Sequence, residues 1–246
     1  MQRVNSYDLY RGVLLIGMVI FHILVNLSSL QFDQRQFYFV PAGFVFFLGL
    51  ILAYFLKHRT VKKFTLVTKL LAIFLLLNIP NFISKDFTVL DFIAGDPQIF
   101  SFEILFPMAI AIFLTVPIDK IHRIKSAKLT KSIQWIFLTI LILLLPILNY
   151  FNIFYYNLTF TIYGLIGYFT ACLWDFDQTL QQFQRTIIKK IFSIIFFALI
   201  TVIPFFILHF FDLYDLVVLL QIFAMYFVFN LILKNNKVLT VVGKHS

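Results

Sequence analysis

The chain has 246 residues, of which 61% are hydrophobic and 13% are charged, and its formal net charge is +9. Soluble domains contain roughly 45–50% apolar and 25% charged residues, so this composition excludes a water-soluble globular protein. The single cysteine, Cys172, excludes an internal disulfide and a cysteine metal cluster. We therefore predict an integral membrane protein.

Apolar stretches of about twenty residues, the length with which a helix crosses a bilayer, occur eight times along the chain. They are Arg11–Leu30, Phe37–Leu56, Phe64–Ile83, Ile99–Ile118, Ser132–Tyr150, Tyr155–Trp174, Ile188–Phe210 and Leu213–Leu233. The sequence therefore predicts a single all-α polytopic bundle over residues 1–246, with eight transmembrane helices.

Basic residues are distributed unevenly over the loops between these stretches. One side carries the lysines and arginines of segments 57–63, 120–131, 185–190 and 234–244, whereas the other side holds only Arg35 and Lys85. Cytoplasmic loops carry an excess of Lys and Arg, so the N-terminus, the even-numbered loops and the C-terminus are predicted to be cytoplasmic. This topology and attraction to anionic lipid account for the positive charge without a nucleic-acid partner. A share of the basic face is also available to an anionic cytoplasmic ligand.

The first apolar stretch carries two ionisable residues, Arg11 and His22. Eleven helical steps of about 100° bring both to one face and separate them by about 16 Å along the axis. Asp8 and Asn26 extend this face in the two directions, and we call the four residues the polar stripe. Ionisable groups at membrane depth are costly and mostly face protein or water, so the polar stripe is predicted to be functional. For each residue alone, an interfacial anchor or an interhelical hydrogen bond is the alternative.

Asn26 and two further polar residues are candidates for a substrate-acceptor side of the site. Asn78 lies in the third stretch, and Glu103 lies in the fourth, roughly 6 Å inside its outer end. Glu103 either orients His22 or contacts the acceptor, with an interfacial glutamate that reaches water as the alternative. No metal-ligand spacing is convincing among the polar residues, so no metal is predicted.

Three segments resemble motifs of one enzyme family. Asp8-Leu9-Tyr10-Arg11-Gly12, with a histidine eleven residues after the arginine, resembles the opening of the membrane-bound acyltransferase superfamily. That superfamily includes acyltransferase-3 proteins, glucan succinyltransferase-like proteins and relatives of heparan-α-glucosaminide N-acetyltransferase. The run Gly43–Gly49 is similar to its Phe-rich second span, and Val242–Ser246 resembles the Gly-(Arg/Lys)-x-Ser element before its last span.

The resemblance implies a multi-pass enzyme of a bacterial inner membrane. Such an enzyme moves an acyl group, such as acetyl, from cytoplasmic acyl-CoA to a hydroxyl or amine of a cell-envelope saccharide. Acyl-CoA is then the donor substrate, and no tightly bound cofactor is expected. Arg11, held by Asp8, would bind donor phosphate or polarise the acyl carbonyl, and His22 would act as a general base or as a transient acyl carrier.

The resemblance also predicts that this chain lacks the family's last span, because that span follows the Gly-Lys-x-Ser element with which the sequence ends. Two other functions remain open. One is a transporter or flippase for an anionic or lipid-linked glycan, in which the polar stripe lines a path. The other is a truncated relative without catalytic activity.

Reporter fusions after Lys62 and Lys125 test the predicted orientation. Both positions are expected to lie in the cytoplasm, because they belong to the basic side of the chain. Alkaline phosphatase, active outside, and green fluorescent protein, fluorescent inside, measure the location of each fusion. A fusion after Lys85 is the control and is expected to report the outside, and an external signal at Lys62 or Lys125 would show that the orientation is wrong.

Overall fold

The computed structural model describes residues 5–27, 38–84, 88, 104–124, 127–150, 156–184, 187–207, 214–233 and 237–245. Within these residues the protein is all-α and contains ten helices. The chain divides into two compact units, the first formed by Met1–Phe44 with Asp175–Ser246 and the second by Val45–Trp174. The all-α prediction is confirmed, whereas the assignment of residues 1–246 to one domain stays a prediction.

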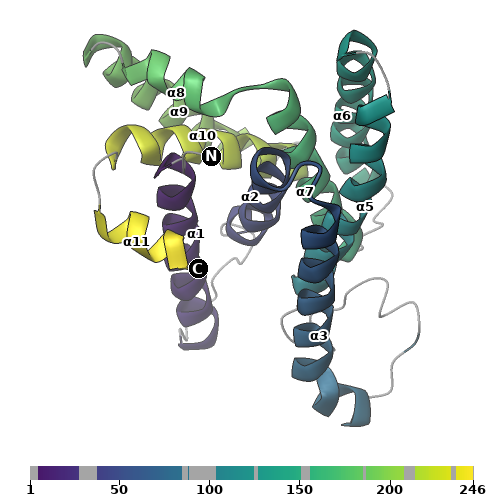
Figure 1. The fold of residues 1–246 in the computed structure, drawn as a ribbon. Coiled ribbons are helices and arrows are strands. Elements are labelled where there is room, and N and C mark those ends of the chain that lie inside the picture. The colour runs from purple at the N-terminus through teal and green to yellow at the C-terminus, as the bar shows by residue number, and fades with distance from the viewer. Residues whose placement is uncertain are drawn as a thin grey trace. The chain divides into compact units, whose positions relative to one another are not determined.

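The first unit is organised around helix α10. Its helices are α1 (Asn5–Leu27), the first turns of α2 (Phe39–Phe55), α8 (Phe176–Gln184), α9 (Ile187–Ile207), α10 (Tyr214–Ile232) and α11 (Lys237–His245). Helix α10 packs against α1, α8 and α9, and α11 lies along α1 (Figure 1). The two ends of the described chain therefore meet within one unit.

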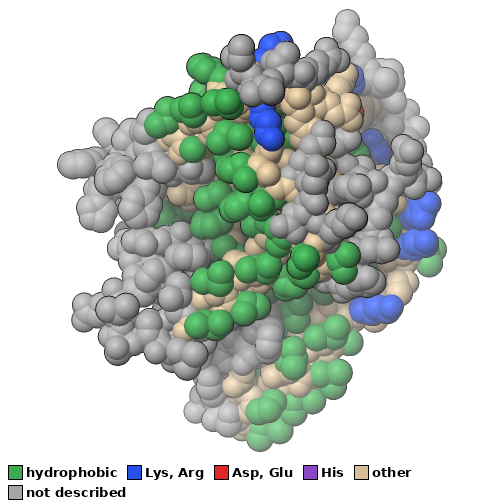
Figure 2. Space-filling model, turned by 90° about the vertical axis from the view of Figure 1, so that its left-hand side faces the viewer, with side chains coloured by type: hydrophobic (Ala, Val, Ile, Leu, Met, Phe, Trp, Pro, Cys, Tyr) green, Lys and Arg blue, Asp and Glu red, His purple; other side chains and the backbone are tan. Residues whose placement is uncertain are grey.

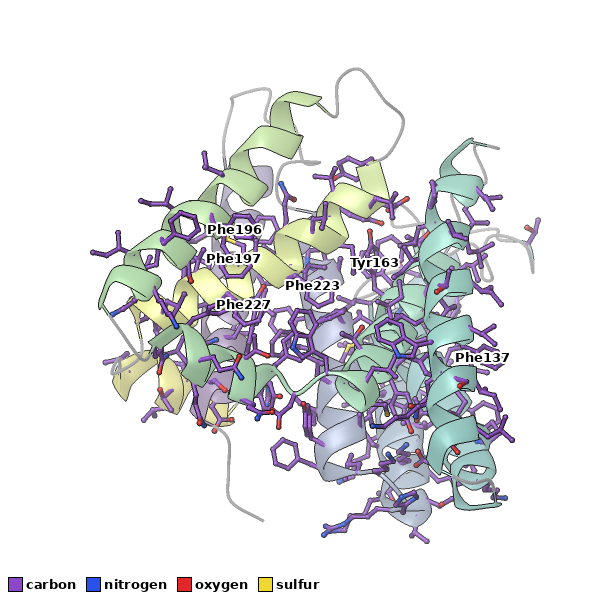
Figure 3. All side chains as sticks on the ribbon, turned by 90° about the horizontal axis from the view of Figure 1, so that it is seen from above. Phe137, Tyr163, Phe196, Phe197, Phe223 and Phe227 are labelled. Carbon is purple, nitrogen blue, oxygen red and sulfur yellow. The ribbon has the colours of Figure 1, made fainter. Side chains whose placement is uncertain are left out.

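Aromatic rings of α10 form much of the core of the first unit. Phe227 stacks on Phe197 of α9 with ring centroids 4.8 Å apart, and Figure 3 shows these rings beside one another. Tyr226 meets Tyr10 of α1 edge-on at 5.6 Å, and the Tyr10 hydroxyl donates a hydrogen bond to the Ile222 carbonyl at 3.2 Å. Ring pairs of this kind contribute about 0.5–1.5 kcal/mol beyond their burial, so they hold α1 and α9 against α10.

Two glycines bring the backbones of α1 and α11 into contact. A methyl group on Gly12 would overlap the carbonyl of Leu239, and one on Gly243 would overlap the carbonyl of Asp8. Small residues at a helix crossing permit this close approach, which is common in membrane proteins. The Asp8–Gly12 turn and the glycine of α11 therefore lie together although they stand at opposite ends of the sequence.

The second unit is organised around helix α7. Its helices are the remainder of α2, α3 (Thr60–Ser84), α5 (Leu105–Ile124), α6 (Ala127–Tyr150) and α7 (Tyr156–Leu173). Helix α7 packs against α5 and α6, and α3 packs against α5 (Figure 1). Most side chains of α7 are buried, so this helix forms the centre of the unit.

Glycines also mediate the contact between α2 and α7. A methyl group on Gly49 would overlap the carbonyl of Gly164, and one on Gly167 would overlap the carbonyl of Phe46. Two segments of the same unit thus approach through backbone atoms, as α1 and α11 do. Gly49 and Phe46 belong to the Phe-rich run of the second apolar stretch, so its glycine has a packing role in this structure.

Three helices in the described part of the chain are long and apolar enough to cross a membrane, namely Thr60–Ile83, Leu129–Leu148 and Tyr214–Ile232. The prediction of eight spans is therefore wrong. A run of apolar residues does not fix the length or the surroundings of a helix, and α2 ends after 17 residues. Helix α7 carries buried polar side chains, including Asn157, Thr161 and Thr170, which lower its hydropathy.

Helices α3 and α6 expose apolar side chains over much of their length. Leu76 of α3 is 65% exposed, and Trp135 and Leu143 of α6 are each 57% exposed. Hydrophobic side chains also cover much of the described surface on the side of α1 and α11, which faces the viewer in Figure 2. Soluble monomers rarely expose large apolar patches, so these surfaces suit contact with lipid chains, as in a multi-pass membrane protein.

Replacing Gly167 with Ala tests the contact between α2 and α7. The added methyl meets the backbone carbonyl of Phe46, so the helices must separate. We expect the free energy of unfolding to fall by about 1–3 kcal/mol. Thermal unfolding in detergent measures the loss. Gly17→Ala is the control and should lower stability less. Its methyl would lie 3.3 Å from Cγ2 of Val40, a side-chain atom rather than backbone. Equal unfolding temperatures for Gly167→Ala and the parent protein would contradict the contact.

Candidate functional site

The polar stripe lies on one uninterrupted helix, α1. The Asp8 side chain is 7% exposed, and the Arg11 side chain is half-buried. His22 and Asn26 belong to the same helix, while their side chains lie outside the described part of the chain. The predicted helix is therefore present, and the catalytic and acceptor roles of His22 and Asn26 stay predictions.

The turn that carries Arg11 is held by its contact with α11. The carbonyl of Asp8 and the amide nitrogen of Gly12 both lie against Gly243, so Arg11 stands on a stretch of α1 whose backbone is fixed on one side. Its half-buried guanidinium has donors in a planar fork that matches a phosphate or carboxylate. This end of α1 therefore has the chemistry to bind an anion.

Of the residues predicted for the acceptor side, Asn78 lies on α3 in the second unit. The Asn78 amide donates to the Phe74 carbonyl at 2.9 Å, and its oxygen accepts from Asn81 at 3.0 Å. Asn78 thus bonds within its own helix, α3, in the second unit. Glu103 lies outside the described residues, and its role stays a prediction.

The second unit contains a buried ion pair that the sequence motifs did not reveal. The Lys63 ammonium lies 2.8 Å from Oδ2 of Asp119, and the two side chains are 0% and 2% exposed. The same ammonium donates to Oγ1 of Thr115 at 2.9 Å and lies 5.2 Å from the centre of the Tyr168 ring. A lysine of α3 is therefore paired inside the unit with a carboxylate of α5.

Asp119 receives hydrogen bonds from three directions. In addition to Lys63, the Tyr168 hydroxyl donates to Oδ1 and the backbone N–H of His58 donates to Oδ2 at 3.0 Å. His58 has φ of 67°, a left-handed conformation in which histidine is enriched among non-glycine residues. One carboxylate thus connects α3, α5, α7 and the turn between α2 and α3, and we call these contacts the Asp119 network.

The surroundings of Asp119 favour its charged form. The residue follows the last position of the predicted fourth span, at the polar end of α5. Burial acts to raise the pKa of this carboxyl, but the hydrogen bonds from Lys63, Tyr168 and the His58 N–H outweigh burial and hold the pKa below its usual range. Asp119 is therefore ionised at neutral pH.

The sequence placed Lys63 among loop cations, and the structure corrects this placement. Helix α3 begins at Thr60, and Lys63 lies on the buried side of that helix with Val67, Phe74 and Asn78. The spacing of these residues follows the helical repeat. Extending the third apolar stretch by one turn toward its N-terminal end would have identified Lys63 as an inward-facing lysine in need of a carboxylate.

No protein-family model matches the chain, and no curated protein or solved structure shows significant similarity to it. The resemblance to membrane-bound acyltransferases therefore rests on the short motifs around Asp8–Gly12, His22 and the two glycine segments. It stays a prediction.

Removing the carboxylate of Asp119 is expected to destabilise the protein strongly. Asp119→Asn leaves the Lys63 ammonium buried without its counter-charge, and breaking a buried pair in this way costs about 3–5 kcal/mol. The double variant Lys63→Met with Asp119→Leu should lose less, because no charge remains buried. Thermal unfolding in detergent measures both.

Lys62→Met is the control for this comparison, since Lys62 is exposed one residue away from Lys63, and its unfolding temperature should hardly change. An Asp119→Asn variant as stable as the parent protein would show that the pair is not a stabilising contact.

Proposed function

We propose that the protein is an acyltransferase of a bacterial inner membrane that transfers an acyl group from cytoplasmic acyl-CoA to a cell-envelope saccharide. The supporting observation is the packing of Asp8–Gly12 against Gly243. Two segments that resemble separate motifs of one acyltransferase superfamily stand at opposite ends of the sequence and share a helix crossing. Three helices apolar enough to cross a membrane are consistent with the location.

Arg11 binds the anionic donor in this proposal. Its guanidinium is half-buried, so a ligand can reach it while part of its surface is protected from water. The glycine contact with α11 holds the helix backbone on which Arg11 stands, and a rigid support improves the geometry of a binding group. The fork of guanidinium donors suits a phosphate of CoA or the carbonyl of the acyl group.

The separation of Arg11 and His22 suits a long donor. The two residues lie about 16 Å apart along the axis of α1. Acyl-CoA carries its phosphates at one end and its thioester at the other, joined by a flexible arm. A single donor molecule can therefore contact Arg11 with its phosphates and present its acyl group near His22.

The reaction exchanges one bond at the acyl carbon. The acceptor oxygen or nitrogen attacks the thioester carbonyl and gives up its proton, the carbon–sulfur bond breaks, and CoA leaves as its thiol with that proton. His22 takes and returns the proton as a general base, or it carries the acyl group between two successive transfers. Both roles use a neutral imidazole.

Release of free CoA by the protein purified in detergent tests this function. With acetyl-CoA and cell-envelope glycan, His22→Ala is expected to abolish release, because the proton acceptor or acyl carrier is lost. Arg11→Ala is expected to raise the KM for acetyl-CoA about tenfold or more, since a charge-assisted hydrogen bond contributes roughly 1.5–3 kcal/mol. Arg11→Lys should recover part of that loss.

His122→Ala is the matched control, because it removes an imidazole from α5 rather than from α1, and it should retain the parent rate. The absence of CoA release from folded parent protein would contradict acyl transfer and favour transport of a glycan or a relative without catalytic activity. Release that persists in His22→Ala would remove His22 from the mechanism.

A further inference from the structure

Basic residues adjoin the Asp119 network along the chain at one end of the second unit. Three network residues, His58, Lys63 and Asp119, each have a lysine or arginine next to them in the chain. These neighbours are Lys57 and Arg59 beside His58, Lys62 beside Lys63, and Lys120 beside Asp119. We call these four residues the basic rim; three of them are exposed and Lys57 is half-buried.

The Asp119 network determines where the basic rim lies. The His58 N–H and the Lys63 ammonium both bond to the same carboxylate oxygen, at 3.0 and 2.8 Å. Consecutive Cα atoms are about 3.8 Å apart, so each rim residue begins within one chain step of a residue tied to Asp119. The turn and the two helices therefore carry four cationic residues whose backbone lies next to that of the Asp119 network.

Acidic residues do not neutralise the basic rim within the described part of this unit. Between Val45 and Trp174 the described residues contain one carboxylate, Asp119. That carboxylate is 2% exposed and is already paired with Lys63, so it leaves the charge of the rim almost unchanged. The rim has the electrostatic character of a site for an anion.

The basic rim lies at the start of a helix that can cross a membrane, since the apolar span of α3 begins at Thr60. The end of α7 lies nearby, because the Tyr54 hydroxyl of α2 donates to the Trp174 carbonyl at 3.1 Å. Trp174 is 46% exposed. Tryptophan and basic residues together are typical of the membrane–water interface.

We propose that the basic rim binds the headgroup of an anionic phospholipid in the leaflet at which α3 begins. The phosphate accepts from the Arg59 guanidinium and from the ammonium groups of Lys62 and Lys120. Cationic groups beside a membrane span attract anionic headgroups, and groups held around one point recognise a single phosphate better than dispersed ones. This site is independent of the proposed acyl transfer.

Native mass spectrometry of the full chain in a neutral detergent tests the proposal, with phosphatidylglycerol as the anionic lipid and phosphatidylcholine as the neutral one. The parent protein should retain phosphatidylglycerol preferentially. The triple variant Arg59→Gln, Lys62→Gln, Lys120→Gln should raise the apparent Kd for phosphatidylglycerol at least about tenfold. The matched variant Lys131→Gln, Lys189→Gln, Lys190→Gln removes the same charge from α6 and α9 and should leave the Kd within about twofold of the parent.

Two variants of the Asp119 network separate a fixed site from general attraction. Asp119→Asn removes a negative charge, so net charge alone predicts tighter lipid binding, whereas a rim held in place by Asp119 predicts weaker binding. Tyr168→Phe leaves every charge unchanged and should also weaken binding. It keeps the proposal testable if Asp119→Asn does not fold.

Three results would overturn the proposal. The first is an equal loss of phosphatidylglycerol in the two triple variants, and the second is unchanged or tighter binding in Tyr168→Phe and in folded Asp119→Asn. The third comes from added pyrophosphate, a soluble anion of similar chemistry. If pyrophosphate displaces the lipid through the rim residues, the rim is a site for a soluble phosphate ligand and not for a lipid.

Discussion

Both units depend on helix backbones that approach each other at glycines. In the first unit Gly12 and Gly243 allow α1 and α11 to touch, and in the second Gly49 and Gly167 do the same for α2 and α7. A side chain at any of these positions would occupy the space of a neighbouring carbonyl. Small residues at such crossings increase the van der Waals packing between the two helices. The close crossings therefore set which polar residues lie near one another.

The buried ion pair shows how the second unit accommodates charge among apolar helices. A lysine ammonium in such surroundings is costly unless it is paired and hydrogen-bonded. Asp119 supplies the opposite charge, Thr115 accepts a second hydrogen bond, and the Tyr168 ring lies beside the ammonium. The same carboxylate fixes the turn at His58. A single buried carboxylate thus joins α3, α5, α7 and the turn before α3.

Helix positions could be predicted from the sequence with more success than helix ends and contacts. The predicted stretches Phe37–Leu56 and Leu213–Leu233 lie close to α2 and α10, because their polar flanking residues mark the ends. Helices α1 and α3 begin earlier than the apolar residues do, at Asn5 and Thr60. Each continues into polar residues where tertiary partners are available, and this extension brings Asp8 and Lys63 into their helices. Hydropathy alone cannot detect such partners.

The sequence by itself determined the structural class of the protein. Its apolar composition and helix-length hydrophobic stretches predicted an all-α protein with helices that can cross a membrane, because lipid requires internal backbone hydrogen bonds. Only the tertiary structure decided that Lys63 pairs with Asp119 and that Gly12 meets Gly243. These partners lie far apart in the chain, and composition and helical periodicity act locally. Their meeting depends on how the helices pack.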